Sequence, residues 1–253
     1  MLDHRQEWLA ARGIRFLFVV CPDKHTIYPE YLPYAARPPA RPSRLDQLAK
    51  RLRTDARVTF VDLRPLLLAN KASRQLYYRR DTHWTDSGAL LGAQQIIRKL
   101  HQWYPQTPVP QLADFRAVPV SAPVDLVPLL GLSPNDLRER AVRLLPKQPF
   151  QARITAGDPG RLPAVGGAAA ATERKQAPIP RAIILRDSFA LSLVPYLSEV
   201  FGHATYLWTS QLSRERVGKE KPDVVIWELV ERDLIDPVPA WAVGEWWPGD
   251  RPR

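Results

Sequence analysis

The regular alternation of short apolar segments with amphipathic segments most constrains the fold of this chain. The apolar run over residues 14–20 follows Gly13, which ends a helical pattern over residues 2–12. An apolar run without alternating polar residues is typical of a strand buried on both faces, as in a parallel sheet. Further predicted strands are residues 58–63, 76–79, 182–185, 205–208 and 224–229, and further predicted helices are residues 45–53, 65–71, 89–100, 189–200 and 213–219. This order predicts an α/β fold with a mostly parallel sheet flanked by helices.

The length of 253 residues is ordinary for one α/β domain, so we expect residues 1–253 to form a single domain. The 26 prolines predict many rigid loop segments around its core. Residues 104–124 are proline-rich and lack clear periodicity, while residues 125–130 and 134–142 are predicted to form short helices. Residues 157–180, rich in Gly, Ala and Pro, are expected to form a flexible insertion.

The formal net charge of +10 predicts attraction to a polyanion, whether nucleic acid, anionic lipid or acidic polysaccharide. The sequence contains no helix-turn-helix, zinc-finger or RNP pattern, and its arginines are scattered, so we expect no nucleic-acid binding. Cys21 is the only cysteine, which excludes a disulfide or a cysteine-based metal cage within this sequence. The five histidines show no paired metal spacing, and we expect no bound metal.

Two short motifs carry the residue types of a Ser/His/Asp hydrolytic site. Asp81 and His83 follow one predicted strand, and Ser188 follows another at the point where a helix begins. Because the carboxyl ends of parallel strands meet at one edge of a sheet, both motifs fall on the edge where chemistry is expected. A serine nucleophile for acyl transfer needs a base to take its proton and a carboxylate to orient that base, irrespective of chain order.

Each of these residues also has a structural interpretation. Ser188 fits a helix N-cap, a position that favours serine. His83 could be a core histidine bonded to a carbonyl group, and Asp81 could be a turn residue. The joint position of all three at strand ends favours the catalytic interpretation. Gly-x-Ser-x-Gly is absent, which excludes the nucleophile elbow of the α/β-hydrolases.

Four blocks of the sequence together resemble a known family. They are the early block Cys21–Pro33 with its Pro-Asp-Lys and Tyr-Pro-Glu elements, Asp-Thr-His-Trp at 81–84, Asp-Ser-Phe at 187–189, and the late block Lys221–Arg232 with its Pro-Asp-Val-Val element. In this order, and over most of the chain, they resemble the alginate O-acetyltransferase branch of the SGNH-hydrolase-like proteins. Asp-Thr-His-Trp together with Asp-Ser-Phe is the most specific part of the match. The resemblance implies an SGNH-hydrolase-like fold.

The resemblance also implies a mechanism and the residues that perform it. Ser188 would be the nucleophile that takes an acetyl group, His83 its general base, and Asp81 the carboxylate that orients His83. A hydroxyl group of an exopolysaccharide would then accept the acetyl group. The net charge fits an acidic, alginate-like polymer and leaves the identity of the sugar open. We further expect the pH profile of turnover to rise near the ordinary pKa of histidine, about 6.5.

Members of the family work in the periplasm, where a membrane-bound O-acyltransferase delivers the acetyl group across the inner membrane. The resemblance therefore implies this partner and a periplasmic location, and it requires no soluble cofactor. The first residues lack the apolar core of a signal peptide, and family members usually carry additional sequence before the Pro-Asp-Lys block. We expect either that an N-terminal part of the family domain is missing here or that the location departs from the family.

Four further residues are predicted to contact the substrate, namely Lys24, Tyr28, Trp84 and Arg232. Exposed loop positions with no substrate role are the alternative for Lys24, Tyr28 and Arg232. For Trp84 the main interpretation is packing beneath the base, and stacking on a sugar is the alternative. Separate Gly and Asn blocks of the SGNH type are absent, so the oxyanion donors beyond the Ser188 region stay unassigned.

Two other functions remain open on the sequence. An esterase or deacetylase would use the same three catalytic residues with water as the acceptor. A non-catalytic polysaccharide-binding module of a biosynthetic complex is favoured if the turn before Ser188 is spoiled. Arg186 raises this question, because it stands where these enzymes usually begin a Gly-Asp-Ser turn.

Overall fold

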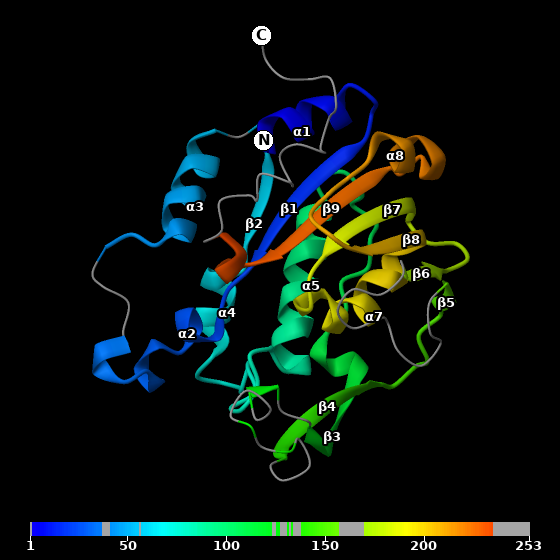
Figure 1. The fold of residues 1–253 in the computed structure, drawn as a ribbon. Helices are drawn as coiled ribbons and strands as arrows, with labels where there is room; N and C mark the ends of the chain where they lie inside the picture. The colour runs from blue at the N-terminus through cyan, green and yellow to red at the C-terminus, as the bar shows by residue number, and fades with distance from the viewer. Residues whose placement is uncertain are drawn as a thin grey trace.

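The centre of the molecule is a seven-stranded sheet with the strand order β2-β1-β9-β7-β8-β6-β5 (Figure 1). The computed structural model describes residues 2–36, 41–55, 57–122, 125–126, 131, 133, 138–156 and 170–234. Strands β2, β1, β9, β7 and β8 pair in parallel, and β6 and β5 complete the sheet in antiparallel pairing. The predicted α/β fold with a mostly parallel sheet is confirmed. The strands are β1 (Arg15–Cys21), β2 (Thr59–Asp62), β5 (Arg153–Ala156), β6 (Ala170–Glu173), β7 (Ile179–Arg186), β8 (Phe201–Trp208) and β9 (Val224–Val230).

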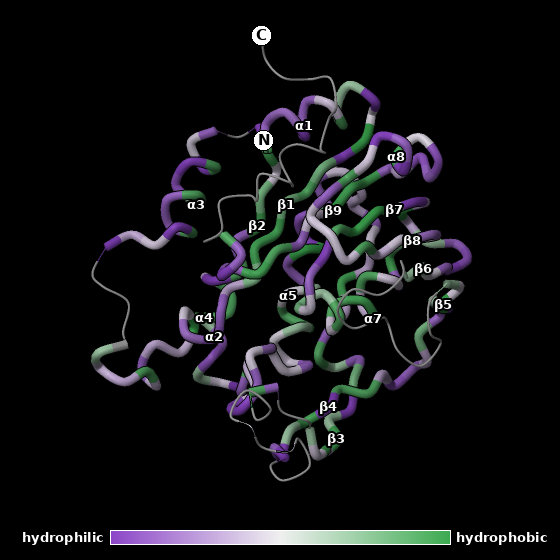
Figure 2. Tube along the Cα trace, viewed as in Figure 1, coloured by the Kyte–Doolittle hydropathy of each residue, from purple (hydrophilic) through white to green (hydrophobic). Residues whose placement is uncertain are grey.

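Alternate side chains of the central strands pack against two separate layers of helices. Phe16 and Phe18 of β1 belong to one hydrophobic cluster, and Leu17 and Val19 belong to a second. Successive side chains of a strand point to opposite faces of the sheet, so β1 supplies both clusters. Figure 2 shows the hydrophobic positions along the central strands and α5. The first cluster includes residues of α1 (Leu2–Ala10), α3 (Arg44–Thr54) and α8 (Arg214–Glu220), and the second includes residues of α4 (Arg64–Asn70), α5 (Asp86–Leu100) and α7 (Val194–Leu197).

Local capping explains where several helices begin. Ser43 and Asp46 form a reciprocal capping box at the start of α3, and the Ser213 hydroxyl accepts from the Arg216 N–H at the start of α8. Thr85 caps α5 by accepting from the Gly88 N–H. The short helices are α2 (Lys24–Ile27), η1 (Pro29–Tyr31), η2 (Tyr34–Ala36), η3 (Leu112–Asp114), η4 (Phe189–Ser192), η5 (Ser198–Val200) and η6 (Glu231–Leu234).

A β-hairpin outside the main sheet was not predicted. Strands β3 (Phe115–Ala122) and β4 (Glu139–Pro146) pair antiparallel and lie beyond the sheet at one end of the molecule (Figure 1). The predicted helix over 134–142 is wrong for residues 139–142, which lie in β4, and residues 134–137 are outside the described residues. Most side chains of the hairpin are exposed or half-buried, so no strong apolar alternation marks these strands in the sequence.

Three other expectations also need correction. The predicted strand over 76–79 is reduced to one bridge between Tyr77 and Trp84. The predicted helix over 189–200 is broken into η4, α7 and η5, with Pro195 in the first turn of α7, where a proline lacks the N–H that a continuous helix needs. The described part of the predicted flexible insertion, residues 170–180, contains β6 and the start of β7. Residues 157–169, and 127–130 of the predicted helix 125–130, lie outside the described residues.

No helix within the described ranges combines the length and the apolar character needed to cross a membrane.

Candidate active site

Two loops at the carboxyl edge of the sheet carry the predicted catalytic residues. Ser188 follows the end of β7 and immediately precedes η4. His83 lies in the loop closed by the Tyr77–Trp84 bridge, just before α5. The Trp84 indole N–H donates to the Phe189 carbonyl oxygen at 3.1 Å, and this buried hydrogen bond ties the histidine loop to the serine loop.

The structure brings Ser188, His83 and Asp81 into hydrogen-bond contact. His83 Nε2 lies 2.7 Å from Ser188 Oγ, and His83 Nδ1 lies 2.7 Å from Asp81 Oδ1. The same Asp81 oxygen accepts from the backbone N–H of His83 at 2.8 Å. This tight turn explains how a spacing of only two residues places both side chains together. The arrangement has the connectivity of a nucleophile, a base and an orienting carboxylate.

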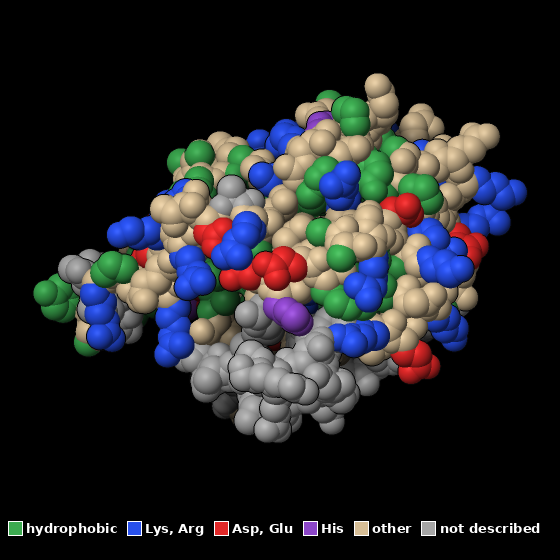
Figure 3. Space-filling model, turned by 90° about the horizontal axis from the view of Figure 1, so that it is seen from above, with side chains coloured by type: hydrophobic (Ala, Val, Ile, Leu, Met, Phe, Trp, Pro, Cys, Tyr) green, Lys and Arg blue, Asp and Glu red, His purple; other side chains and the backbone are tan. Residues whose placement is uncertain are grey.

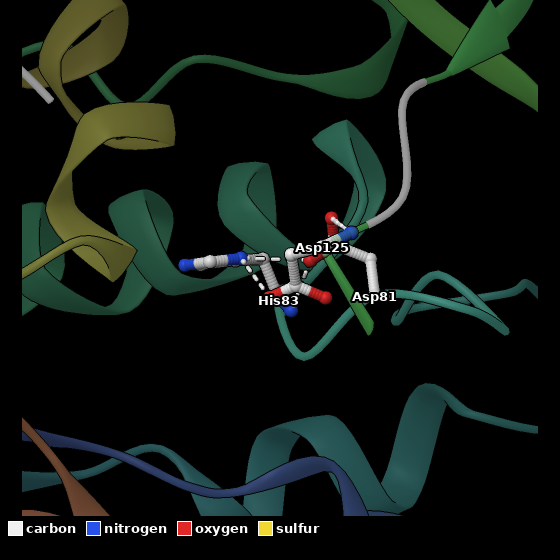
Figure 4. Close-up of side chains that lie close together, drawn as sticks. All are labelled: Asp81, His83 and Asp125. Atoms are coloured by element: carbon white, nitrogen blue, oxygen red, sulfur yellow. Dashed lines mark hydrogen bonds and ion pairs between the residues drawn. The ribbon is translucent and has the colours of Figure 1, made fainter. Parts of the chain in front are cut away.

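Asp125 also contacts His83, and sequence reasoning missed it (Figure 4). Its Oδ2 lies 3.4 Å from His83 Nδ1, and its carboxylate accepts from the N–H of Thr82 at 2.8 Å and from the Thr82 hydroxyl. Its own backbone N–H donates to Asp81 Oδ2 at 3.1 Å. Asp125 is 43 residues beyond Thr82, at the start of a predicted short helix, so no sequence signal linked it to the motif.

These neighbours set the charge state of His83. Burial alone would lower the pKa of the imidazole, because it disfavours the charged form. Hydrogen bonds with Asp125 and Asp81, and the attraction of both carboxylates, outweigh that effect and raise the pKa of His83 to about 9. For Asp125, burial raises the pKa, but the contacts with His83 and Thr82 prevail and lower it to about 2. These neighbours thus move the pKa of His83 above the ordinary histidine value expected from the sequence.

The turn that carries Ser188 is held by Asp187. Its carboxylate accepts from the backbone N–H groups of Phe189 at 2.8 Å and Val230 at 2.6 Å, and its own N–H donates to Glu228 Oε2 at 3.0 Å. Glu228 is 1% exposed, and burial, followed by repulsion from Asp187, raises its pKa well above the ordinary value. Burial likewise raises the pKa of the Cys21 thiol, which favours the neutral form and argues against Cys21 as a nucleophile.

Arg186 does not spoil the turn. Gln176 and Lys221 are the non-glycine residues with positive φ among the described ones, so Arg186 has a backbone conformation that does not require glycine. Its guanidinium lies 4.8 Å from the centre of the Trp208 ring, and Nη1 donates to the Asp187 carbonyl oxygen at 3.2 Å. An arginine at position 186 therefore leaves the turn before Ser188 intact.

The residues predicted to contact the substrate differ in their burial and in their hydrogen-bond partners. Trp84 is 1% exposed, so its ring is packed beneath the site and is closed to a sugar, which corrects its predicted substrate contact. Lys24 Nζ donates to the carbonyl oxygens of Tyr78, Arg79 and Asp81 at 3.2, 3.1 and 2.8 Å, and therefore braces the histidine loop.

Tyr28 and Arg232 flank the site from two other elements. The Tyr28 hydroxyl accepts from the Leu76 N–H at 3.1 Å. Arg232 Nη1 lies 2.7 Å from Asp23 Oδ1, and its guanidinium lies 5.3 Å from the centre of the Phe189 ring. Its side chain stays 39% exposed, so it can still meet a ligand.

A cavity of about 740 Å³ lies beside the histidine loop. Its lining combines aromatic rings with cationic side chains and includes Lys24, His25, Tyr28, Tyr31, Lys71, Arg74, Tyr77, Tyr78 and Arg79. Tyrosine faces can stack on sugar rings, and cations can pair with sugar carboxylates.

Among the residues that the structure describes, Asp81, His83 and Asp125 form a group that could hold a metal ion, because one ligand atom from each lies within 4.8 Å of the others. The imidazole atom involved would be Nδ1, which here faces the two carboxylates. A cation in this position would therefore compete with the proton that the triad needs on Nδ1. The absence of a metal stays a prediction.

Comparison with known proteins identifies the family. Residues 1–159 match the model of a family described as "SGNH hydrolase-like domain, acetyltransferase AlgX". The match covers more than half of the chain. The chain belongs to this family. Membership in the AlgX acetyltransferase family confirms the resemblance seen in the four sequence blocks.

Curated relatives of this AlgX-family chain are probable alginate O-acetylases named AlgJ. The protein from Pseudomonas fluorescens is 25% identical over 264 residues, which cover 95% of this chain and 64% of the relative. The protein from Pseudomonas syringae pv. tomato is 28% identical over 241 residues, which cover 89% of this chain and 59% of the relative. The chain thus spans about three fifths of the length of these relatives.

Solved structures share the fold of this AlgX-family chain. Bacillus cereus PatB1 matches with a TM-score of 0.70 and 18% identity, covering 92% of this chain and 85% of PatB1. The O-acetyltransferase domain of Pseudomonas putida AlgJ matches with a TM-score of 0.58 and 21% identity, covering 96% of this chain and 86% of that domain. The SGNH-hydrolase-like fold is confirmed.

Proposed function

We propose that this protein is an O-acetyltransferase that moves an acetyl group through Ser188 onto hydroxyl groups of an exopolysaccharide. The observation that carries the proposal is the 2.7 Å contact of His83 Nε2 with Ser188 Oγ in a chain of an acetyltransferase family. The curated relatives with matching sequence are named alginate O-acetylases, which supports a polysaccharide acceptor.

The mechanism proceeds in two half-reactions. In the first, His83 Nε2 takes the proton of Ser188 Oγ, which attacks the acetyl carbonyl carbon, and the leaving group departs with that proton. In the second, His83 takes a proton from a sugar hydroxyl, whose oxygen attacks the acetyl-serine ester, and His83 returns that proton to Ser188 Oγ as the bond between the acetyl group and the serine breaks. Asp81 holds the Nδ1 proton and stabilises the imidazolium that forms in each half-reaction.

We propose that the cavity beside the histidine loop receives the polysaccharide, and that the polymer is acidic. Tyr28 and Tyr31 would contact sugar rings, while Arg74 would face sugar carboxylates. Arg232 would contact the same chain near Ser188. Figure 3 shows Lys and Arg side chains on both sides of one face of the molecule, with acidic side chains between them. The net charge of +10 supports the same class of ligand.

The acetyl group must come from a donor that reaches Ser188. Family resemblance supports a membrane-bound O-acyltransferase as this donor and the periplasm as the location. With that donor, the protein itself would need no soluble cofactor.

Acetyl transfer to a sugar tests this proposal directly. The protein is incubated with an acetate ester and a uronic-acid oligomer, and the oligomer is then weighed by mass spectrometry. We expect oligomers heavier by whole acetyl groups, and none with Ser188→Ala. An oligomer of unchanged mass together with free acetate would instead assign the esterase function, in which water is the acceptor. An absence of both products would favour the binding module.

A further inference from the structure

Asp125 contacts both the proposed base and the carboxylate that orients it. Its carboxylate faces His83 Nδ1 at 3.4 Å and accepts from the Thr82 N–H at 2.8 Å, while its backbone N–H donates to Asp81 Oδ2 at 3.1 Å. The carboxylate is only partly exposed, with a side-chain exposure of 34%, so its charge is less screened than that of a free surface residue. Any movement of this residue would therefore disturb Asp81, Thr82 and the imidazole together.

A second acidic residue, at the start of strand β4, binds the same loop. Glu139, at the start of β4, is opposite Ala122, the last residue of β3. Its carboxylate accepts from the backbone N–H groups of Arg79 at 2.8 Å and Arg80 at 2.9 Å. Glu139 thus holds the loop without contacting the imidazole, whereas Asp125 contacts the imidazole itself.

We propose that Asp125 is a positioning residue for the base, so that two carboxylates orient and charge-balance one imidazole. The inference rests on the proposed acetyl-transfer function. In each half-reaction His83 becomes positively charged, and Asp125 adds a second negative charge near Nδ1 at that moment. The same contacts keep the ring turned so that Nε2 faces Ser188. Asp125 thereby belongs to the active site.

Other charged groups also face His83 and must be kept constant in a test. Asp81 bonds Nδ1, Lys24 binds the Asp81 carbonyl oxygen, Asp187 precedes Ser188, and Arg232 lies over Phe189, whose ring centre is 5.1 Å from that of His83. The variant used in the test therefore leaves all four of these residues unsubstituted.

Asp125→Asn is the decisive variant, because an amide keeps the shape, the Asp125 backbone N–H and an oxygen acceptor for Thr82 but removes the charge. We expect kcat for acetate-ester turnover to fall about tenfold with KM nearly unchanged, as for loss of an interaction made in the transition state. We also expect the midpoint of the pH profile to move down by about one unit, since the imidazolium loses a stabilising charge.

The titration of His83 is measured separately by NMR in a Ser188→Ala background, where no turnover is needed. The same downward shift is expected there for Asp125→Asn. This readout stays valid even if the protein proves not to be an acetyltransferase, so failure of the proposed function and failure of this inference can be told apart.

Two matched controls separate positioning from support of the loop. Asp114→Asn changes a carboxylate just before β3 that accepts from the Gln111 N–H and should match the parent in every measurement. Glu139→Gln weakens the hydrogen bonds to the backbone N–H groups of Arg79 and Arg80. It should leave the midpoint of the His83 titration unchanged even if the protein becomes less stable. A folded Asp125→Asn protein with an unchanged His83 midpoint and unchanged kcat would overturn the proposal.

Discussion

At the scale of single residues, the site depends on one hydroxyl, one imidazole and two carboxylates. The Ser188 side chain makes no capping hydrogen bond at the start of η4, although a serine in this position would usually be a cap. Its oxygen instead faces His83 Nε2. Ser188 thus occupies the N-cap position of η4 without a capping hydrogen bond from its side chain.

This difference makes a prediction for Ser188→Ala. Without the hydroxyl no acetyl-enzyme can form, so we expect acetate-ester turnover to fall on the order of 10⁴-fold or more. Because no cap is lost, the free energy of unfolding should change by less than about 1 kcal/mol. Ester turnover and thermal unfolding are measured on the same preparation. Full turnover in the folded variant would remove the acyl-enzyme mechanism.

The raised pKa of His83 makes a prediction for pH dependence. A base must be neutral to take a proton, so turnover should rise with pH toward a midpoint near the value of about 9 given by Asp125 and Asp81. The stability of the fold should change with pH in the opposite direction to turnover. A raised folded-state pKa contributes stability that is complete below about 6.5 and is lost as pH rises through about 9.

His83→Ala tests both parts of this pH prediction. Turnover should approach the low level of Ser188→Ala, because the residues of a triad act as a unit. The loss of stability between pH 6.5 and 9 should become shallower than in the parent protein, as followed by urea unfolding. A rise of parent turnover centred near pH 6.5 would contradict the proposed effect of the two carboxylates.

At the scale of elements, the close approach of α5 to the strand-like segment before the histidine loop holds the site together. A Cβ atom on Gly88 would lie 2.4 Å from the Leu76 carbonyl oxygen and 2.9 Å from the Trp84 Cβ atom. Thr85 donates its N–H to the same Leu76 oxygen at 2.8 Å. The first turn of α5 therefore fits against the Tyr77–Trp84 bridge only with glycine at position 88.

Gly88→Ala should therefore weaken both the fold and the site. We expect a loss of about 1–3 kcal/mol in the free energy of unfolding, as for overpacking elsewhere, and a lower kcat because the histidine loop must shift. The control is Gly218→Ala in α8, where an added Cβ meets nothing within 4 Å. Alanine there should leave turnover unchanged and raise helix stability by up to about 1 kcal/mol. Equal behaviour of the two variants in chemical unfolding and ester turnover would refute this packing argument.

At the scale of the whole molecule, the net charge of +10 and the cavity of aromatic and cationic residues predict how ligands bind. Binding of a uronic-acid oligomer should weaken as salt rises, because exposed charges are screened over about 8 Å at physiological ionic strength. A neutral oligomer of the same length should show little dependence on salt. Calorimetric titration of both oligomers at low and high salt makes the comparison. Tighter, salt-insensitive binding of the neutral oligomer would refute the acidic substrate and leave acetyl transfer untouched.

The sequence by itself determined the parts of this protein that are encoded locally. Buried apolar runs such as residues 14–20 marked the strands of the parallel sheet, and the motifs at 81–84 and 187–189 indicated which side chains would meet. These signals are readable because periodicity and strand-end position depend on neighbouring residues. The same signals were weak in β3 and β4, whose side chains are mostly exposed.

Only the tertiary structure decided what depends on distant groups. Asp125 binds Thr82, which lies 43 residues earlier in the sequence. The Trp84 indole is buried and donates to the Phe189 carbonyl oxygen. The ammonium of Lys24 donates to carbonyl groups of the histidine loop. The pKa of His83 is set by burial against the summed effect of Asp125 and Asp81, one of which no motif identifies. Contacts of this kind follow from how the chain packs, because electrostatic energies depend on distance in space and on burial, whatever the separation in sequence.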